Sequence, residues 1–334
     1  MKNEIVRKIS VGLLILATAV QLAACSKEDA ADIEVSKIEK AAHVNNGELQ
    51  GDSTVVGVGN TKVLYDEYRV YSWFLKNQYE DVMSEDVWNY NLGTVTVGQS
   101  AIEDILRLII QIKVMNKEAA GLGISLGVDE KGDVDYKADQ YLATIPPEVQ
   151  AANGITPAVI HQIFEENEVA RKVYDVVTGN VEANVDEASM QAAKVLVVFY
   201  PAGADNRDVV RAQIDALASD VKQYKGNFYS CVKDKTGSAP KEMIIGRMDK
   251  RATLAAAALA MKKYSVSDVV EESDGFYLMY CLKNNTKGLN KVYREQYIAG
   301  QQNTTFQAAY ENWAEKYEVK VSKSLLMDKQ AQEQ

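Results

Sequence analysis

The spacing of apolar residues changes once along this chain, and the change limits the folds open to it. Between Tyr65 and Val177 these residues recur mainly every three or four positions, which is the spacing of amphipathic helices. At Ala193 a continuous run begins, AKVLVVFY, whose β-branched and aromatic residues are typical of a buried strand. We therefore predict an α+β chain in which a mostly helical module precedes a smaller α+β domain.

The helical module is expected to open with a hairpin and a tyrosine-rich helix. The stretch VVGVGNTKVLY has two apolar runs around Gly59-Asn60, which is a plausible tight turn. The helix after it carries five apolar residues at helical spacing: Tyr65, Tyr68, Tyr71, Leu75 and Tyr79. Such a stripe could bind peptide, or it could be core with its hydroxyls reaching water. The helical spacing favours the core.

Two further helices of the module have recognisable starts. Ser100 and Glu103 are expected to form a capping box, which satisfies two amides at the start of one helix. Thr156 and Pro157 are expected to be the N-cap and the first residue of the other, which ends at Gly179. With these helices, the module is expected to be mostly helical and to contain little strand.

The second domain is predicted to have the order strand, helix, helix, helix, strand. Helices are expected at about 206–225, 227–235 and 252–263, and GFYLMYCL at 275–282 is expected to be the closing strand. A last helix, at about 288–317, carries Phe306, Tyr310 and Trp313 at helical spacing and is followed by a short β-like VKVS. This apolar face needs a partner, so we expect it to fold together with the first module.

The N-terminus has the features of an exported lipoprotein. A basic start is followed by an almost wholly apolar run at 9–24, which is short for a membrane span. Leu22-Ala23-Ala24-Cys25 then matches the bacterial lipobox. Residues 1–24 are thus predicted to be a signal peptide, and Cys25 to carry a two-chain lipid anchor on the outer face of the bacterial cell membrane. The alternative is an ordinary signal peptide beside a chance cysteine. Residues 25–53 are charged and small, and we interpret them as a flexible tether.

The net charge excludes one class of partner. The whole chain carries −10, and removal of residues 1–24, which carry +2, leaves −12. A chain of this charge is repelled by nucleic acid and by anionic lipid heads. Its contact with the membrane is therefore expected to come from the lipid on Cys25.

The sequence offers few groups for metal, cofactor or nucleophilic chemistry. It has only two histidines, His43 and His161, no His/Cys cluster with metal spacing, and no glycine-rich phosphate or dinucleotide loop. The acidic stretch 129–139 lacks the pattern of a calcium loop, so a solvated helix face is expected. We predict no metal and no cofactor. His161 could be a general base, but with no nucleophile in view a surface role is favoured.

Cys231 and Cys281 are the other two cysteines of the chain. They could form a disulfide in an oxidising compartment, or they could be small apolar core groups. Their spacing does not decide between these alternatives.

Several motifs, in order, resemble the SurA/PrsA-like foldases, exported chaperones with a parvulin-type prolyl isomerase domain. VGVGNTKVLYDEY resembles their opening strand, turn and helix; LIIQIKVMNKEAAGLGISL, GITPAVIHQIFEENEVARKVY and the Phe306, Tyr310, Trp313 helix resemble later ones. The resemblance implies a discontinuous chaperone module at 54–185, an inserted parvulin-like domain at 190–285, and a C-terminal helix at 286–325 that returns to the module. It also implies unfolded exported polypeptides as partners.

The resemblance is weakest at the catalytic positions of the parvulin-like domain. Lys194 and Tyr277 stand where the family has two histidines, Ser238 lies near the acidic or cysteine position, and Leu254 lies near the aromatic of the proline pocket. MIIGR replaces the usual glycine-rich turn. We therefore assign no catalytic residue and expect prolyl isomerisation to be weak or lost.

Three functions remain open from the sequence. The favoured one is a membrane-tethered extracytoplasmic chaperone or foldase for unfolded exported proteins. The first alternative is an active parvulin-type prolyl isomerase with an unusual site. The second is a solute-binding lipoprotein, although that class normally alternates strand and helix through two lobes.

Overall fold

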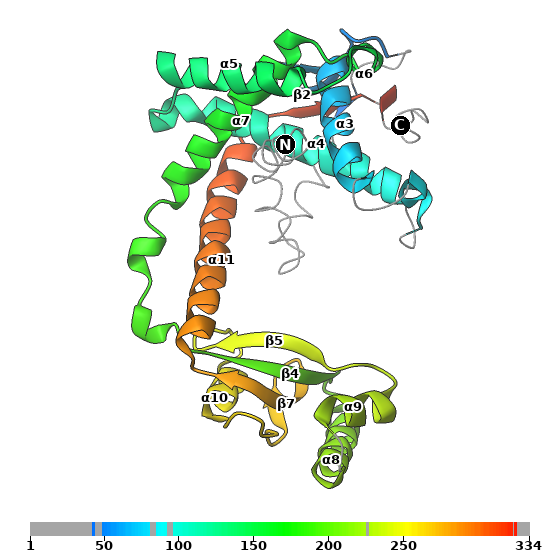
Figure 1. Cartoon of the computed structure of the whole chain (residues 1–334), viewed down its shortest axis with the longest axis vertical. Coiled ribbons are helices and arrows are strands. Elements are labelled where there is room, and N and C mark those ends of the chain that lie inside the picture. Colours follow the sequence, from blue (N-terminus) through cyan, green and yellow to red (C-terminus); the bar gives the residue numbers. More distant parts are fainter. Residues whose placement is uncertain are drawn as a thin grey trace. The chain divides into compact units, whose positions relative to one another are not determined.

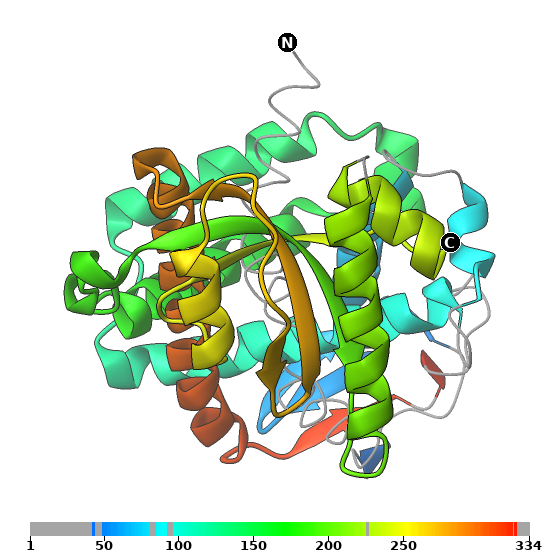
Figure 2. The same ribbon diagram turned by 90° about the horizontal axis from the view of Figure 1, so that it is seen from below.

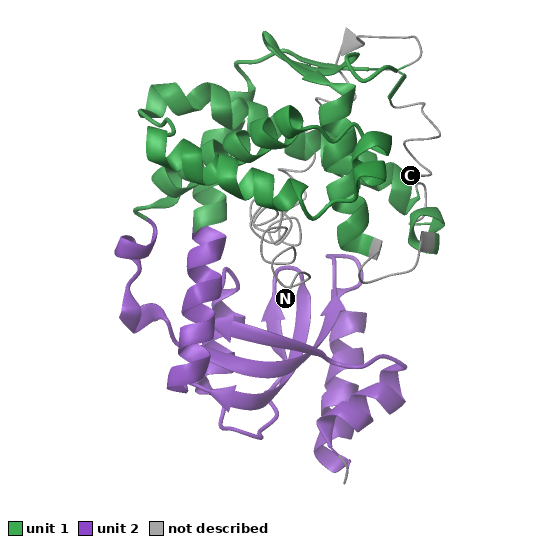
Figure 3. Cartoon of the chain, turned by 45° about the horizontal axis from the view of Figure 1, so that its top comes forward, with its two compact units in different colours: residues 1–180, 302–334 green, residues 181–301 purple. Residues whose placement is uncertain are grey.

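The computed structural model describes residues 42–43, 49–80, 85–91, 96–224, 227–322 and 324–325. The chain forms two compact units: residues 1–180 with 302–334, and residues 181–301 (Figure 3). The first unit is discontinuous, since the second is inserted between its two segments. Helices and two four-stranded sheets make up the described part of the chain, which is the predicted α+β class.

A small sheet covers one side of the first unit. Its strands are β1 (Ala42–His43), β2 (Thr54–Val58), β3 (Thr61–Leu64) and β8 (Val319–Val321), in the order β1-β8-β2-β3. The predicted hairpin is β2–β3, and Gly59 in its turn has a φ of +57°, which a glycine adopts without strain. β8 pairs antiparallel with β2, so strands from both segments of this unit share the sheet.

The end of the predicted tether belongs to this unit. The amide of Asp66 donates to the carbonyl of Gly51 at 3.0 Å, and that of Tyr65 donates to the carbonyl of Ser53 at 2.9 Å. Leu49 packs against the apolar core. Residues 49–53 are therefore ordered, because they satisfy the first free amides of the helix that starts at Tyr65.

Among the described residues of the first segment, five α-helices and two short 3-10 turns complete this unit (Figure 1). The helices are α3 (Tyr65–Glu80), α4 (Val97–Ala119), α5 (Val128–Leu142), α6 (Pro147–Ala152) and α7 (Pro157–Thr178); the 3-10 turns are η1 (Glu85–Asn89) and η2 (Ala120–Leu122). α6 was not predicted. It uses Pro147 at its first position, where the missing amide proton costs nothing. Thr156 caps α7 as expected.

The predicted capping box of α4 was wrong. α4 begins at Val97, and its box is formed by Thr96 and Gln99, whose backbone amides each donate to the other's side chain. Ser100 and Glu103 thus lie inside the helix. The same Ser/Thr-x-x-Glu/Gln pattern occurs twice within eight residues, and the earlier one is used because helical spacing already extends to it.

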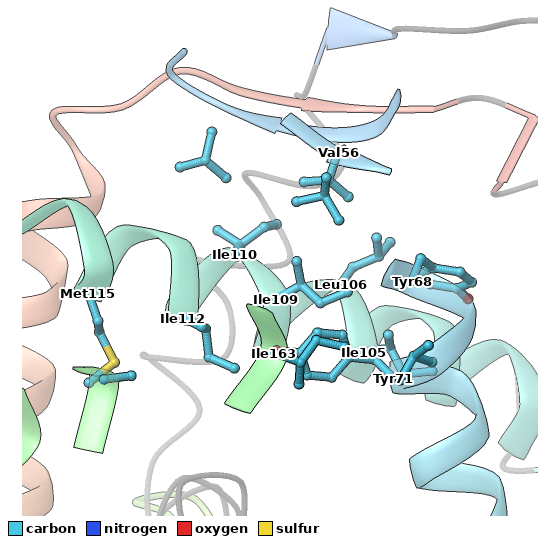
Figure 4. Close-up of a cluster of buried hydrophobic side chains, with 14 of the residues drawn as sticks. Val56, Tyr68, Tyr71, Ile105, Leu106, Ile109, Ile110, Ile112, Met115 and Ile163 are labelled. Carbon is cyan, nitrogen blue, oxygen red and sulfur yellow. The ribbon is translucent and has the colours of Figure 1, made fainter. Parts of the chain in front are cut away.

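The core of the first unit is built on the apolar face of α4 (Figure 4). Leu106 and Ile109 are fully buried there, together with Tyr68 and Tyr71 of α3. The two central tyrosines of the predicted stripe are therefore core residues. The last part of helix α11 (Lys287–Ala314) adds its own buried aromatics to the same core: Phe306 and Tyr310.

The second unit contains a four-stranded antiparallel sheet of order β5-β4-β7-β6. Its elements are η3 (Glu182–Asn184), η4 (Glu187–Ser189), β4 (Ala192–Pro201), α8 (Arg207–Gln223), α9 (Phe228–Thr236), β5 (Lys241–Gly246), α10 (Ala252–Ala260), β6 (Val270–Glu272) and β7 (Gly275–Asn284), with the first part of α11. β5 and β6 were not predicted. Both are short edge strands with charged residues, and edge strands carry a weak apolar signal.

The two faces of this sheet are covered by different helices (Figure 2). Val198, Phe276 and Leu278 pack under α8 and α9, whereas Val197 and Met279 pack under α10. Alternate residues of a strand point to opposite faces, so β4 and β7 serve both layers. This alternation determines which of the predicted site residues can meet.

Candidate functional site

Lys194 and Tyr277, which the resemblance predicted to stand at the two histidine positions, are not neighbours in the structure. Tyr277 lies directly across from Phe199 on β4, whereas Lys194 lies across from Lys283. Five residues of extended strand separate Lys194 from Phe199, a distance of about 17 Å at 3.3–3.4 Å per residue. The ammonium of Lys194 instead lies 2.6 Å from Oε1 of Glu242 on the edge strand.

Ser238 also lies apart from Tyr277. It is exposed in the turn after α9, where its amide donates to the hydroxyl of Thr236 at 3.2 Å and its carbonyl accepts from that hydroxyl at 3.0 Å. Leu254 is the one predicted position that shares a cluster with Tyr277, and its side chain, on the inner face of α10, is fully buried. It therefore offers no surface to a prolyl ring.

The surroundings of Tyr277 form a polar cluster that the sequence motifs did not predict. The hydroxyl of Tyr277 donates to Oδ2 of Asp274 at 2.6 Å, and Arg251 Nη1 donates to the same hydroxyl at 3.2 Å. Arg251 is itself paired with Asp249, at 3.2 Å. The ring of Phe199 stacks on that of Tyr277, with centroids 4.6 Å apart. We call these five residues the Tyr277 cluster.

The surroundings of the Tyr277 cluster keep the Tyr277 phenol neutral and the Arg251 guanidinium charged near neutral pH. Burial, and then the hydrogen bond to Asp274, raise the pKa of Tyr277, so its phenol stays neutral. Partial burial lowers the pKa of Arg251, but its hydrogen bonds to Asp249 and Tyr277 outweigh this and raise it overall. Neither group is thus placed to exchange a proton near neutral pH.

The same region is tied down by a carboxylate and an arginine. Oε1 of Glu272 accepts the amide of Leu254 at 2.7 Å, which satisfies a free amide in the first turn of α10. Arg207 donates to the carbonyl of Glu272 at 2.5 Å and to the carboxylate of Glu271 at 2.8 Å. These hydrogen bonds hold strand β6, the β6–β7 turn and the first turn of α10 in fixed positions. This is the pattern of a rigid scaffold.

Sequence reasoning could not assemble the Tyr277 cluster. Asp249 and Arg251 lie in a loop before α10, Asp274 lies in the β6–β7 turn, and Phe199 lies on β4. A bulge between Lys194 and Val195 shifts the register of β4 against β7, and strand spacing alone does not reveal it. The only local signal was the Asp274-Gly275 pair, which favours a tight turn.

The remaining predicted residues occupy separate places. Cys231 and Cys281 are free, buried, and packed on opposite faces of the sheet, so they are core residues and not a disulfide. Burial raises the pKa of both thiols. His161 lies on α7, half-buried beside Asp135 and Asp139 of α5. Cys25 lies outside the described residues.

The described residues contain neither a metal centre nor a membrane span. No group of three or more histidine, cysteine, aspartate or glutamate side chains there could hold a metal ion. Within the same ranges, no helix has the length and apolar character needed to cross a membrane.

Comparison with known proteins gave matches among solved structures alone. No family model and no curated protein matches the chain. One of two structurally related SurA-like chaperones of Campylobacter jejuni is 11% identical, over 81% of this chain and 99% of that chain, with a TM-score of 0.28. The peptidylprolyl isomerase PrsA of Bacillus cereus is 14% identical, over 84% and 99%, with a TM-score of 0.32. PrsA of Bacillus anthracis is 15% identical, over 63% and 97%, with a TM-score of 0.33. SurA-like chaperones and PrsA foldases are thus among the solved structures to which the chain is similar.

Proposed function

We propose that this protein is a lipid-anchored extracytoplasmic chaperone that binds unfolded exported polypeptides, and that its parvulin-like domain has lost prolyl isomerase activity. The loss of prolyl isomerase activity is proposed from the contacts of the Tyr277 cluster. Catalysis of this reaction must lower a barrier of about 18–20 kcal/mol by burying the prolyl ring and weakening amide resonance. Here the positions that the resemblance aligns with the family's site hold a neutral phenol, hydrogen-bonded to Asp274 and Arg251, and a fully buried Leu254.

The chaperone role is supported by the chain's own architecture. Chaperone action requires apolar surface that competes with client aggregation, and no catalytic pair. The helical unit carries half-buried aromatic rings of α3, among them Trp73 and Phe74, next to its core. The active isomerase remains the alternative. A solute-binding lipoprotein is disfavoured, since every strand pair of the two described sheets except β1–β8 is antiparallel, whereas β-α-β units pair their strands in parallel.

The two activities are expected to separate in a fragment covering residues 26–334. Turnover of a prolyl tetrapeptide should not exceed the uncatalysed rate, which takes tens to hundreds of seconds. The same fragment should suppress aggregation of an unfolded client in a concentration-dependent way. The variants Tyr277→Phe and Lys194→Ala serve as controls, and neither should change either readout beyond its effect on stability.

Two outcomes would contradict this proposal. Clear catalysis that Tyr277→Phe or Lys194→Ala abolishes would establish the active isomerase. Stoichiometric binding of one small solute, without protection of the client, would favour the solute-binding class.

Lipid attachment at Cys25 is expected from the lipobox that directly follows the apolar run. Cys25→Ser should release the chain from the membrane fraction, because the two acyl chains supply its attachment. Fractionation and the mass of the N-terminal peptide measure this. A variant that remained acylated and membrane-bound would show that the anchor lies elsewhere.

A further inference from the structure

Helix α11 belongs to both compact units. It runs without a break from Lys287 to Ala314, and one boundary between the units falls inside it, between residues 301 and 302 (Figure 3). The other boundary falls between residues 180 and 181, just after α7. The stretches of chain around these two boundaries are therefore the covalent connections between the units.

The first half of α11 is fixed to the inserted unit. Leu289 and Tyr293 pack with Met190 and Ala192 in a buried cluster. The hydroxyl of Tyr293 also accepts the amide of Met248 at 3.1 Å. Apolar packing and a hydrogen bond thus hold this half within its unit.

The second half of α11 is fixed to the helical unit. Phe306, Tyr310 and Ala314 are buried in the core that α4 and α7 build. Just beyond the helix, the ammonium of Lys316 lies 2.7 Å from Oε2 of Glu118 on α4. Each half of α11 is therefore expected to be as stable as the core that it packs against.

The middle of α11 has no such support. Residues 299–305 are exposed or half-buried, whereas Ile298 and Phe306 on either side are buried. Most of the stability of a helix in a protein comes from packing, so this stretch depends on the helix propensity of its residues. Its sequence, AGQQNTT, contains a glycine, the poorest helix former after proline, and an asparagine and two threonines, which are also poor. The middle is therefore the weakest part of α11.

The other connection has the same character. Thr178 and Met190 are buried, but none of residues 179–189 between them is buried. Glu182 and Glu187 pair with Arg294 in the first half of α11, so the chain from residue 182 onward is held by the inserted unit. Only residues 179–181 lie between this anchored part and the end of α7.

We propose that residues 179–181 and 299–305 form a joint, at which the inserted unit changes its orientation relative to the helical unit. A bend there exposes no core, because neither stretch contains a buried side chain. Gly300 is the expected centre of the bend in α11, since glycine reaches non-helical backbone angles at the least steric cost. In a chaperone, such a joint lets the two units adjust to clients of different sizes. That use rests on the proposed function, but the joint does not.

Hydrogen exchange of the full chain in detergent tests whether the middle of α11 opens by itself. After correction for intrinsic rates, amides of residues 300–305 should exchange at least about tenfold faster than those of 289–297 and 307–314. Gly300→Ala should slow this exchange about four- to fivefold, because alanine is the better helix former. The added methyl group meets no atom of the described residues within 4 Å. Gln301→Gly should accelerate the exchange about threefold.

Distances between spin labels test whether the units move. One label replaces Tyr136 on α5 and the other replaces Val209 on α8, which are 64% and 62% exposed. The chain carries Cys25→Ser, and its other two thiols are buried. The distribution of distances should be broad, narrower with Gly300→Ala and broader with Gln301→Gly. As the control, labels at Tyr136 and at the exposed Asn77 of α3, both in the helical unit, should give one narrow distribution in all three chains.

Two results would refute the joint. One is protection of residues 300–305 equal to that of both flanking halves. The other is a distribution between the units that is as narrow as the control and is unchanged by Gly300→Ala and Gln301→Gly. Either result would leave the chaperone proposal intact, since these measurements include no client.

Discussion

Phe306→Ala is expected to destabilise the first unit by about 3–5 kcal/mol, the range for removing a buried phenylalanine from a core. Phe306 is 1% exposed, and its ring contacts those of Tyr174, Tyr310 and Trp313. The residue follows the inserted unit in the sequence but packs in the core built by α4 and α7. A mutation near the C-terminus should therefore unfold helices that lie more than a hundred residues earlier.

Denaturant unfolding, followed by hydrogen exchange of α4 amides, measures this effect. Thr305→Ala is the matched control, because its side chain is exposed on the adjacent position of α11 and should change stability by no more than about 0.5 kcal/mol. If Phe306→Ala left the protection of α4 unchanged, the last helix would not belong to this unit. Deletion of residues 288–334 should have a still larger effect in the same direction.

Lys113→Met is expected to cost about 3–5 kcal/mol at pH 7.5, because it leaves the buried carboxylate of Glu67 and the partly buried one of Glu166 without their cation. Lys113 and Glu67 have side chains only 2% and 4% exposed, and Nζ lies 2.7 Å from Oε1 of Glu67 and 2.6 Å from Oε2 of Glu166. These residues come from α4, α3 and α7, so one lysine joins three helices. The amide of Gln162 adds hydrogen bonds to both carboxylates.

The cost of Lys113→Met should fall as the pH is lowered. Burial raises the pKa of Glu67, and the nearby Lys113 partly offsets this in the native chain. Without the lysine, the penalty for the charged carboxylate grows as the pH rises above the unfolded-state pKa and disappears below it. Urea unfolding at pH 7.5 and pH 5 should therefore show a smaller difference from the native chain at the lower pH.

An exposed ion pair provides the control for this prediction. Lys131→Met makes the same substitution in the Lys131–Glu165 pair, whose side chains are 51% and 31% exposed. Its cost should stay below about 1 kcal/mol at both pH values. Equal costs for the two variants would mean that the buried network contributes no more than a surface pair.

Local signals predicted most of the elements of this fold. Helical periodicity located α3, α4, α7 and α8, and the Thr156-Pro157 pair located the start of α7 correctly. These features depend on neighbours three or four residues apart, which the sequence displays directly. β5 and β6 were missed because a short edge strand acquires its structure from the strand beside it, and the box at Thr96 was missed because two matching patterns competed.

The candidate site was predicted less well than the fold. The motifs predicted that Lys194 and Tyr277 occupy the two histidine positions of one site. The register of β4 against β7 instead places Phe199, and not Lys194, beside Tyr277. A shift of register in a sheet changes every cross-strand neighbour. No periodicity in the sequence could have revealed this, since the register is set by pairing between two strands that are distant in the sequence.

The sequence by itself determined the α+β class of the chain, its long helices, and the presence of a lipobox after an apolar run. These are properties of composition and short-range spacing. Only the tertiary structure decided that Arg251 and Asp274 lock Tyr277, that His161 lies between two aspartates, and that Cys231 and Cys281 face opposite layers. Each of these depends on contacts between distant segments, and such contacts are set by how the faces of helices and strands pack together to bury apolar surface.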